Sequence, residues 1–595
     1  MKIKIFFLLL ICINGCAILK AQSLFIQPVS LTDYVFKSPS GNGLLTSVIL
    51  PESSNFQIRI TGKNAKFLSV KGKDIYLKDN YFEQSKGKKQ LQFTIQLKKN
   101  KKIVSQKSFT ILKNQFHHNQ VIAHRGAWKN SATPQNSIAA LNAAIVLGCA
   151  GSETDVHMTS DSELVINHDP LWGGLSVQKS TLEELRKTKL SNGELLPLLP
   201  NFLKTIQNQT GTKLILEIKP SERGREWANA TVQKVISTVH EMQAQAWIVY
   251  ISFDYEMLKE VLRLEPSANV QYLNGDKTPE QLKEDGISGA DYHYSVFQKH
   301  PEWIQSARKN KIDLNAWTVN EEKDMNLLLA NGFDFITTNE PELLFKKIDQ
   351  SPVSKGMKLV WSDEFNYNGL PDSAKWGYQT GGNGWGNREK QYYADADTMN
   401  AIVRNGVLSI IARKENHGTN EFTSARLTTK SKESWTYGRI EISAKLPPGR
   451  GLWPAAWMLG NDVQKIGWPG CGEIDIMEHV GFKKDTILGT VHTGAYNHIK
   501  GTQKGKHELI ENPYSSFHLF AIEWSPEKID FFLDDLKYFE FANEHKTNAE
   551  WPFDKPFYLL LNMAVGGNLG GQQGIDEAAF PATYQIDYVR VFQFD

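Results

Sequence analysis

The chain has 595 residues, of which 41% are hydrophobic and 22% charged, and its formal net charge at pH 7 is +2. A chain of this length is too long for a single hydrophobic core, and we expect about three domains. The composition is that of an ordinary globular protein, and we expect no nucleic-acid partner.

The chain opens with two lysines and an apolar run that starts at Ile5 and is too short to span a bilayer. This pattern predicts an export signal over residues 1–21. Two outcomes stay open. Cleavage after Ala21, which we favour, would give free secretion. A lipid anchor at Cys16 is the alternative, although Asn14 makes the preceding residues a poor lipoprotein cleavage motif. No later segment predicts a membrane span, so we expect a secreted, periplasmic or cell-surface protein.

Of the four cysteines, two lie in the predicted signal, and only Cys149 and Cys471 remain. These two are far apart in the sequence and are expected in different domains, so no disulfide framework is predicted. Large hydrophobic cores must therefore stabilise the protein, which we expect to be a monomer.

Residues 24–115 are strongly basic: 15 lysines and Arg59 stand against five acidic residues, a net charge of +11. Short runs such as FQIRI and QLQFTIQL alternate apolar and polar residues, which predicts a small antiparallel β-sandwich. The segment resembles the cadherin-like or immunoglobulin-like modules of secreted enzymes. Two roles stay open: a solvated spacer whose lysines protect the strand edges, or a module that holds an anionic polymer or surface by its positive field.

From about Phe116 onward, strand-like runs such as VIAHRG, SETDVHMT and KLILEIKP alternate with helical stretches such as SIAALNAAIVLG. This alternation, over residues 119–348, predicts a (β/α)8 TIM barrel. In that fold the active site lies at the carboxyl ends of the strands, so the polar residues that close each run are the candidates.

The polar residues that close these runs form a coherent chemical set. They are His124, Arg125, Glu153, Asp155, His168, Asp169, Glu217 and Lys219. Glu153 and Asp155 are two positions apart, so on a strand their side chains share a face. Together with Glu217 they would give three oxygen ligands to Ca²⁺ or Mg²⁺. The histidines suit acid–base catalysis, and the two basic residues suit a phosphate group.

The motifs AHRG, ETDVHMT, INHDP, LEIKP, NAWTVN and TTNEP follow one another as in glycerophosphodiester phosphodiesterases, and residues 119–348 resemble that family. The resemblance implies cleavage of a glycerophosphodiester to glycerol 3-phosphate and an alcohol. It implies His124 and His168 as general acid and base, and Trp317 in the alcohol pocket. It also implies that Glu153, Asp155 and Glu217 bind the divalent cation. The implied phosphate contacts are Arg125 and Lys219.

One position departs from the family pattern. The family usually has Pro-Glu-Asn-Thr where this chain has Pro134-Gln135-Asn136-Ser137. The missing carboxylate removes a negative charge near the expected metal, which predicts weaker metal binding or an altered substrate range. We expect an active barrel, and the alternative is a degenerate domain that only binds.

Beyond a short linker at residues 350–356, helical patterns nearly vanish. Runs such as YGRIEISAKL and FYLLLNMAV predict a large two-sheet antiparallel sandwich over residues 359–595. Tryptophans are dense in this segment. Trp453 and Trp457, on either side of a proline in LWPAAW, are the strongest candidates for stacking on sugar rings.

Three acidic residues, Glu473, Asp475 and Glu478, lie in the otherwise apolar run GCGEIDIMEHVG. On a regular strand the first two share a face and the third faces the other way. A one-residue bulge near Met477 would bring all three to one side. Two carboxylates on either side of a glycosidic bond are the groups of a retaining glycosidase. A third between them would hydrogen-bond the nucleophile and raise the pKa of its neighbours.

The motifs GNREKQYY, GLWPAAWML and GEIDIMEH make residues 359–593 resemble family 16 glycoside hydrolases, specifically the laminarinase-like endo-β-1,3-glucanases. The resemblance implies a concanavalin-like β-jelly roll, with Glu473 as nucleophile, Asp475 as assisting acid and Glu478 as general acid/base. The implied sugar contacts are Asn387, Arg426, Trp453, Trp457 and His492. The implied ligands of a structural Ca²⁺ are Glu364, the Gly406 carbonyl and Asp587.

The sequence thus predicts a secreted chain with two hydrolases on three domains. One cuts β-1,3 or mixed β-1,3-1,4 glucosidic bonds with retention, and the other cleaves a glycerophosphodiester with a divalent cation. A glucan decorated with phosphoglycerol would explain the fusion. Two alternatives remain: a glucanase whose barrel only binds, or a barrel that recycles lipid headgroups and is anchored to a glycan by the sandwich.

Overall fold

The computed structural model describes residues 29–36, 43–50, 56–78 and 90–594. The predicted export signal, with Cys16 and Ala21, lies outside the described residues. Within the described ranges, no helix combines the length and the apolar character that crossing a membrane requires. Cys149 and Cys471 are both buried, and neither forms a disulfide within the described residues.

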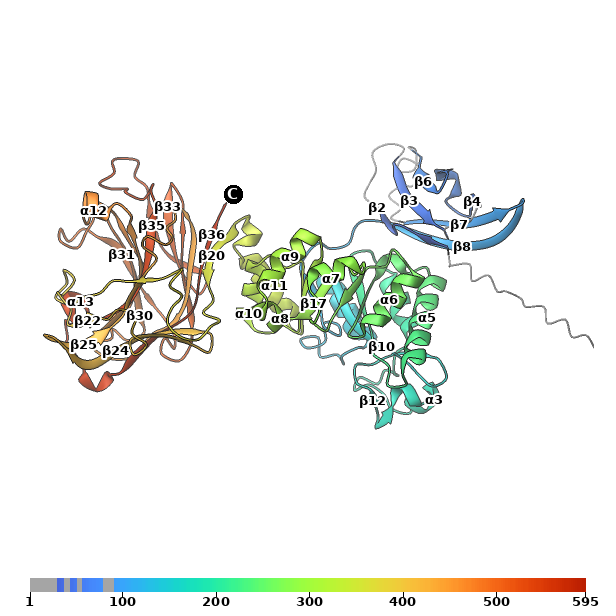
Figure 1. Ribbon diagram of the computed structural model, residues 1–595, viewed down its shortest axis with the longest axis horizontal. Coiled ribbons are helices and arrows are strands. Elements are labelled where there is room, and N and C mark those ends of the chain that lie inside the picture. Colours follow the sequence, from blue (N-terminus) through green and yellow to red (C-terminus); the bar gives the residue numbers. More distant parts are fainter. Residues whose placement is uncertain (1–28, 37–42, 51–55, 79–89, 595) are drawn as a thin grey trace, which may run out of the picture. The chain divides into compact units, whose positions relative to one another are not determined.

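The N-terminal module consists, in its described part, of two four-stranded sheets (Figure 1). The strand order of the first sheet is β1 (Ser30–Leu31), β3 (Leu44–Ile49), β6 (Asp74–Leu77) and β5 (Leu68–Lys71). That of the second is β2 (Val35–Phe36), β8 (Lys102–Lys113), β7 (Gln90–Lys99) and β4 (Gln57–Thr61). In β7, buried Leu91, Phe93 and Ile95 alternate with polar residues, as the sequence pattern requires. The predicted strands are confirmed, but β2 pairs with β8 in parallel rather than antiparallel.

The middle of the chain forms a closed barrel of eight parallel strands, so the TIM-barrel prediction is confirmed. The barrel strands are β9 (Val121–Ala123), β10 (Gly151–Met158), β14 (Lys213–Ile218), β15 (Ile248–Ser252), β16 (Val270–Tyr272), β17 (Gly289–His293), β18 (Asp313–Trp317) and β19 (Phe335–Thr338). A further strand, β11 (Leu164–Ile166), pairs antiparallel with β10. Every residue of β10 is buried, because helices cover the outer face of a barrel and side chains fill its interior.

Helices follow the barrel strands (Figure 1). The longer ones are α2 (Ile138–Leu147), α4 (Leu199–Ile206), α5 (Arg225–Glu241), α6 (Tyr255–Leu264), α9 (Glu302–Asn310), α10 (Glu322–Ala330) and α11 (Pro341–Gln350). Helix α2 begins where the Ser137 hydroxyl accepts a hydrogen bond from the Ala140 N–H, and it ends at Gly148, whose φ of 78° favours glycine. The segment between β9 and α2 thereby holds Asn136 beside β10, where it donates to Asp155.

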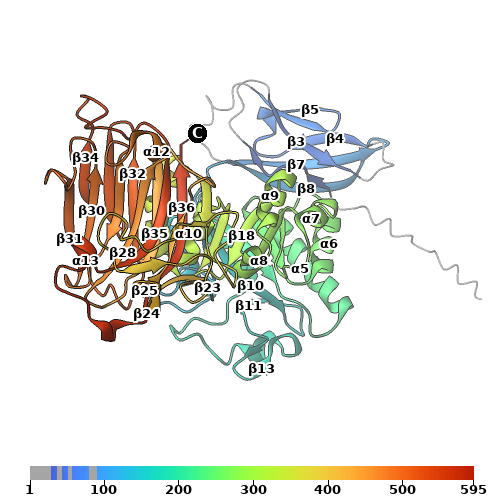
Figure 2. The same cartoon turned by 60° about the vertical axis from the view of Figure 1, so that its left-hand side comes forward.

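The C-terminal domain is a sandwich of two large, mainly antiparallel sheets, whose long strands lie side by side in Figure 2. One sheet contains β20 (Lys358–Asp363), β22 (Gln391–Tyr393), β23 (Ala401–Arg404), β24 (Val407–His417), β25 (Asn420–Ser424), β27 (Gly438–Lys445), β32 (His518–Trp524), β33 (Lys528–Leu533), β34 (Leu536–Ala542) and β36 (Ala582–Gln593). The other has the order β21 (Gly377–Tyr378), β26 (Arg426–Thr428), β35 (Phe557–Val565), β28 (Leu452–Gly460), β29 (Glu473–Glu478), β30 (Thr486–His492) and β31 (Lys504–Leu509). One continuous hydrophobic core includes side chains from both sheets. The predicted jelly-roll sandwich is confirmed.

Candidate active sites

Strand β29 carries the three acidic residues and contains the predicted bulge. Asp475 pairs with Thr490 and Glu478 with Leu488, so three steps along β29 match two along β30. The extra residue turns Glu478 to the side of Glu473 and Asp475, and all three line one cavity of about 640 Å³. Ile474, Ile476 and Met477 face the core instead. The predicted kink is therefore confirmed.

Two tryptophans hold the outer carboxylates of the trio. The indole N–H of Trp468 donates to Glu473 Oε2 at 3.1 Å, and that of Trp453 donates to Glu478 Oε1 at 2.9 Å. Asp475, between them, is 5% exposed, and its Oδ2 accepts no hydrogen bond from the described residues. Each outer acid thus has a fixed donor, whereas the middle one has an oxygen free to share a proton with a neighbour.

Burial and like charge decide the protonation of the trio. Burial, followed by repulsion from Glu473 and Glu478, raises the pKa of Asp475 well above its usual range. Burial and the charge of Glu478 also raise the pKa of Glu473, while the Trp468 N–H acts in the opposite direction. Burial also raises the pKa of Glu478 to about 7, although the Trp453 N–H acts in the opposite direction. Asp475, which lacks such a donor, therefore holds its proton most firmly, and the raised pKa of Glu478 suits a group that must donate a proton.

The hydrogen bond from Trp468 gives a testable pH dependence. A nucleophilic Glu473 must be ionised, so its pKa sets the acid limb of kcat/KM for glucan hydrolysis. Trp468→Phe removes a donor that stabilises the carboxylate, so the pKa rises and we expect the acid limb to move up by about one pH unit. A pH series of kcat/KM measures this shift.

The control for this variant is Trp385→Phe, because Trp385 also lines the cleft but donates to the Gly381 carbonyl instead of a carboxylate. The control should leave the acid limb in place. An unshifted limb in Trp468→Phe would show that this hydrogen bond does not tune the nucleophile.

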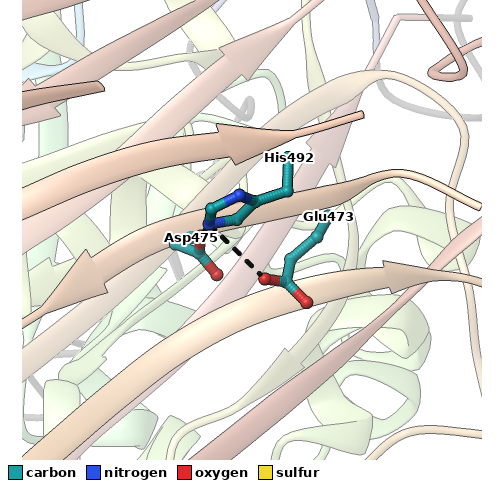
Figure 3. A group of neighbouring side chains, drawn as sticks. All are labelled: Glu473, Asp475 and His492. Carbon is teal, nitrogen blue, oxygen red and sulfur yellow. Dashed lines mark ion pairs between the residues drawn. The ribbon is translucent and has the colours of Figure 1, made fainter. Parts of the chain in front are cut away.

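Four of the five residues implied as sugar contacts line the cleft, namely Asn387, Arg426, Trp453 and Trp457. The Arg426 guanidinium lies 4.8 Å from the Trp457 ring centroid and 4.6 Å from that of Trp385. These cation–π contacts hold the three side chains together as one wall of the cleft. The fifth residue, His492, does not line the cleft but lies next to two of the acids: its Nε2 is 3.8 Å from Glu473 Oε1 and 3.5 Å from Asp475 Oδ2 (Figure 3). Their contacts with sugar remain predictions.

A buried hydrogen-bond chain, absent from our sequence-based assignments, supports the same wall. The Trp457 indole N–H donates to Asn562 Oδ1 at 2.7 Å, the Asn562 amide donates to the Tyr393 hydroxyl at 2.9 Å, and that hydroxyl donates to Glu389 Oε2 at 3.2 Å. Gln391 also donates to Glu389 Oε2, at 2.6 Å. Every donor points toward Glu389, so its carboxylate fixes the direction of the whole chain.

We expect Glu389→Gln to raise KM for laminarin about tenfold with little change in kcat. The variant removes the charge that terminates the chain, and one charge-assisted hydrogen bond stabilises by about 1.5–3 kcal/mol. Trp457 would then lose its fixed orientation, while the catalytic acids would keep their donors. Steady-state kinetics separate KM from kcat.

Glu441→Gln is the matched control. Glu441 is a similarly buried carboxylate that accepts a hydrogen bond from Arg439, and it lies on β27, in the sheet that does not carry the three acids. It should lower the unfolding temperature without changing KM. If both variants changed KM alike, Glu389 would have no specific effect on the cleft.

The residues implied as calcium ligands lie just after β20 (Glu364), between β23 and β24 (Gly406) and within β36 (Asp587). Glu364 accepts two hydrogen bonds from Arg590, at 2.8 and 2.9 Å, so its carboxylate already has a cationic partner. Gly406 has a φ of 76°, and Asp587 is 7% exposed. Asp587 likewise pairs with Lys323, so both implied carboxylate ligands already have cationic partners, and the calcium site remains a prediction.

In the barrel, Glu153, Asp155 and Glu217 come together. Each offers an oxygen, and these oxygens lie within 4.8 Å of one another, with all three side chains buried. Asp155 and Glu217 are direct neighbours in the parallel register of β10 and β14. Lys219 lies beside them, 3.1 Å from Asp155 Oδ1 and 2.7 Å from Glu217 Oε1.

The segment around Gln135 positions the basic residue of the AHRG motif. Arg125 has a left-handed backbone (φ 57°), its N–H donates to Glu153 Oε2 at 2.9 Å, and its guanidinium donates to Gln135 Oε1 at 2.8 Å. Asn136 donates to Asp155 Oδ2 at 2.8 Å. Gln135 therefore keeps a hydrogen bond to the guanidinium, although it lacks the charge of the usual glutamate.

The remaining predicted residues of the barrel lie at strand ends. His124 Nε2 is 4.0 Å from Glu153 Oε2, and His168 Nδ1 is 2.7 Å from Asp169 Oδ1. Trp317 is the last residue of β18, and its ring meets that of His293 edge-on, with the centroids 5.3 Å apart. Their assigned roles remain predictions.

The electrostatics of the barrel trio suit a hard cation. Burial, with the charges of Asp155 and Glu217, raises the pKa of Glu153 well above its usual range. Burial would also raise the pKa of Asp155, but Lys219, His168, Asn136 and Arg125 together lower it. A divalent cation would relieve this crowding of negative charge, and three carboxylate oxygens are the ligands that Mg²⁺ and Ca²⁺ prefer.

Comparisons with known proteins match two separate parts of the chain. The model of glycosyl hydrolases family 16 matches residues 388–590, and that of the glycerophosphoryl diester phosphodiesterase family matches residues 124–343. A third model, described as beta-glucan synthesis-associated protein SKN1/KRE6/Sbg1, matches residues 292–473 and overlaps both.

Individual relatives match the C-terminal part. A beta-glucanase of Rhodothermus marinus is 56% identical over 254 residues, which cover 41% of this chain and 88% of the relative. A glucan endo-1,3-beta-glucosidase of Cryptopygus antarcticus is 39% identical over 251 residues, 39% of this chain and 90% of the relative. The X-ray structure of the laminarinase from Rhodothermus marinus is 55% identical and covers 40% of this chain and 98% of its own, with a TM-score of 0.40.

Fold, site and relatives together define a hydrolase with two catalytic domain types, a glycoside hydrolase sandwich and a phosphodiesterase barrel. The sandwich holds three buried carboxylates in a cleft lined with tryptophans, and the barrel holds three at its strand ends. The chain belongs to glycosyl hydrolases family 16 and also carries a glycerophosphoryl diester phosphodiesterase family domain.

Proposed function

We propose that the C-terminal domain hydrolyses internal β-1,3-glucosidic bonds of a β-glucan, or β-1,3-1,4 mixed linkages, with retention of configuration. The observation that carries this proposal is the bulge in β29, which turns Glu473, Asp475 and Glu478 into one cleft between tryptophan side chains. Relatives named as beta-glucanase and glucan endo-1,3-beta-glucosidase support the choice of polymer.

Each acid has a role that its surroundings favour. Glu473, held by Trp468, attacks the anomeric carbon and forms the glycosyl-enzyme bond while the glycosidic C–O bond breaks. Glu478, held by Trp453, gives its proton to the leaving oxygen and then takes a proton from the water that frees the sugar. Protonated Asp475 donates to Glu473 and stabilises its charge before attack and after release.

We propose that the barrel hydrolyses a glycerophosphodiester to glycerol 3-phosphate and an alcohol. Glu153, Asp155 and Glu217 would hold Ca²⁺ or Mg²⁺, and Arg125 and Lys219 would bind the phosphate. The cation, when bound, neutralises charge on the phosphate oxygens. His124 and His168 would act as general acid and base, and Trp317 would pack on the alcohol.

We further propose that the protein is secreted, to the periplasm or the cell surface, and acts on one polymer with both domains. A glucan decorated with phosphoglycerol would require the barrel to remove charged groups that block the cleft, and tethering raises the effective concentration of the second site. Free secretion after Ala21 and a lipid anchor at Cys16 remain the two modes of export, and we favour a monomer.

The test uses purified full-length protein on laminarin, lichenan and agarose, with and without a chelator. We expect cleavage of laminarin that resists the chelator, a β-configured product in NMR spectra taken within the first minutes, and chelator-sensitive release of glycerol 3-phosphate from a glycerophosphodiester. An α-configured first product would refute retention. Absence of glycerol 3-phosphate at every Mg²⁺ and Ca²⁺ concentration would favour the alternative, a barrel that only binds.

A further inference from the structure

One nitrogen and two oxygens come together beside the glucanase cleft. His492 ends β30 directly opposite Glu473 in the β29–β30 register. Figure 3 shows the imidazole pointing at the carboxylates of Glu473 and Asp475. A nitrogen of His492 and one oxygen from each acid lie within 4.8 Å of one another.

The separations suit a tetrahedral metal. Zinc binds nitrogen and oxygen ligands at about 2.0–2.2 Å, so two ligands of a tetrahedron lie about 3.3–3.5 Å apart. His492 Nε2 is 3.5 Å from Asp475 Oδ2 and 3.8 Å from Glu473 Oε1. Side-chain shifts of a few tenths of an ångström would therefore close the site around an ion.

The two oxygens are available to an ion. Asp475 Oδ2 is buried and has no hydrogen-bond partner among the described residues. The Trp468 N–H is bonded to Glu473 Oε2, which leaves Oε1 facing the imidazole. An unpartnered buried oxygen that points into a cluster of ligands is a feature that a metal ion would satisfy.

The ligand types discriminate between metals. An imidazole with two carboxylates is a ligand set of Zn²⁺, whereas Mg²⁺ and Ca²⁺ prefer oxygen alone, as in the barrel trio.

We propose that Glu473, Asp475 and His492 form a Zn²⁺ site whose occupation inhibits the glucanase by engaging its nucleophile. This inference rests on the proposed function for its consequence, but the binding itself does not. Zn²⁺ would block the cleft while Mg²⁺ or Ca²⁺ would serve the barrel. The two domains of one chain would thus respond to different divalent ions.

The experiment titrates ZnCl₂ into full-length protein by calorimetry. Glu217→Gln is the common background, because it weakens the barrel trio as a competing site. We expect one Zn²⁺ per chain in this background, affinity at least tenfold weaker when His492→Gln or Asp475→Asn is added, and unchanged affinity with His507→Gln. His507 is an exposed histidine on the neighbouring strand β31, and thermal unfolding checks that each variant is folded.

A parallel assay follows laminarin cleavage by the wild type. We expect inhibition by Zn²⁺ that a chelator reverses, and none by equal Mg²⁺. Zn²⁺ affinity that is the same with and without His492, or saturating Zn²⁺ without inhibition, would overturn the inference. If the wild type cleaves no glucan, the proposed function fails, and calorimetry still decides whether the Zn²⁺ site exists.

Discussion

Glu478→Gln is expected to lower kcat on laminarin by about 10²–10⁴-fold, the usual contribution of a general acid–base group. The amide cannot give a proton to the leaving oxygen, although it keeps the size of the side chain and a carbonyl that accepts from Trp453. The fold and the sugar contacts should therefore survive, and KM should change little. Steady-state kinetics on laminarin, with calorimetric unfolding, measure both.

A substrate with a good leaving group sharpens this test. An aryl β-glucoside oligomer whose phenol departs without protonation should lose far less rate in the first, bond-breaking step than laminarin does. Release of glycerol 3-phosphate by the barrel of the same variant is the internal control and should be unchanged. Full laminarin turnover by Glu478→Gln would remove Glu478 from the mechanism.

The kink in β29 could be predicted from the sequence, because the expected glycosidase reaction requires it. Glu473 and Glu478 are five positions apart and cannot share a face of a regular strand, yet a glycosidase needs both in one cleft. Likewise, Glu153 and Asp155 at a strand end predicted a shared face, and their oxygens do lie together with that of Glu217.

Residues whose roles depend on distant strands escaped prediction. Glu389 acts on Trp457 through Tyr393 and Asn562, and Asn562 is 169 positions beyond Tyr393 in the sequence. The only local indication of a role for Glu389 was its place in the motif GNREKQYY. Similarly, Glu364 and Arg590 are 226 positions apart and meet only because β20 pairs with β36 in a particular register. The periodicity of the sequence does not encode that register.

Glu217→Gln should abolish the barrel's activity and leave the glucanase intact. The variant removes one of three buried oxygen ligands, and it also leaves Lys219 with Asp155 as its remaining acidic partner. We expect Mg²⁺ or Ca²⁺ affinity to fall at least about 100-fold, and glycerol 3-phosphate release to fall about 10³-fold because the cation contributes several kcal/mol to charge stabilisation.

Calorimetric titration with MgCl₂ and CaCl₂ separates a loss of cation binding from a loss of catalysis. Glu226→Gln is the matched control, since Glu226 is an exposed glutamate in the first turn of α5. The control should bind the cation and release glycerol 3-phosphate like the wild type. Unchanged release by Glu217→Gln would show that β14 supplies no essential ligand. A barrel that only binds predicts instead that the wild type and both variants release no glycerol 3-phosphate, so the three proteins together decide between catalysis and binding.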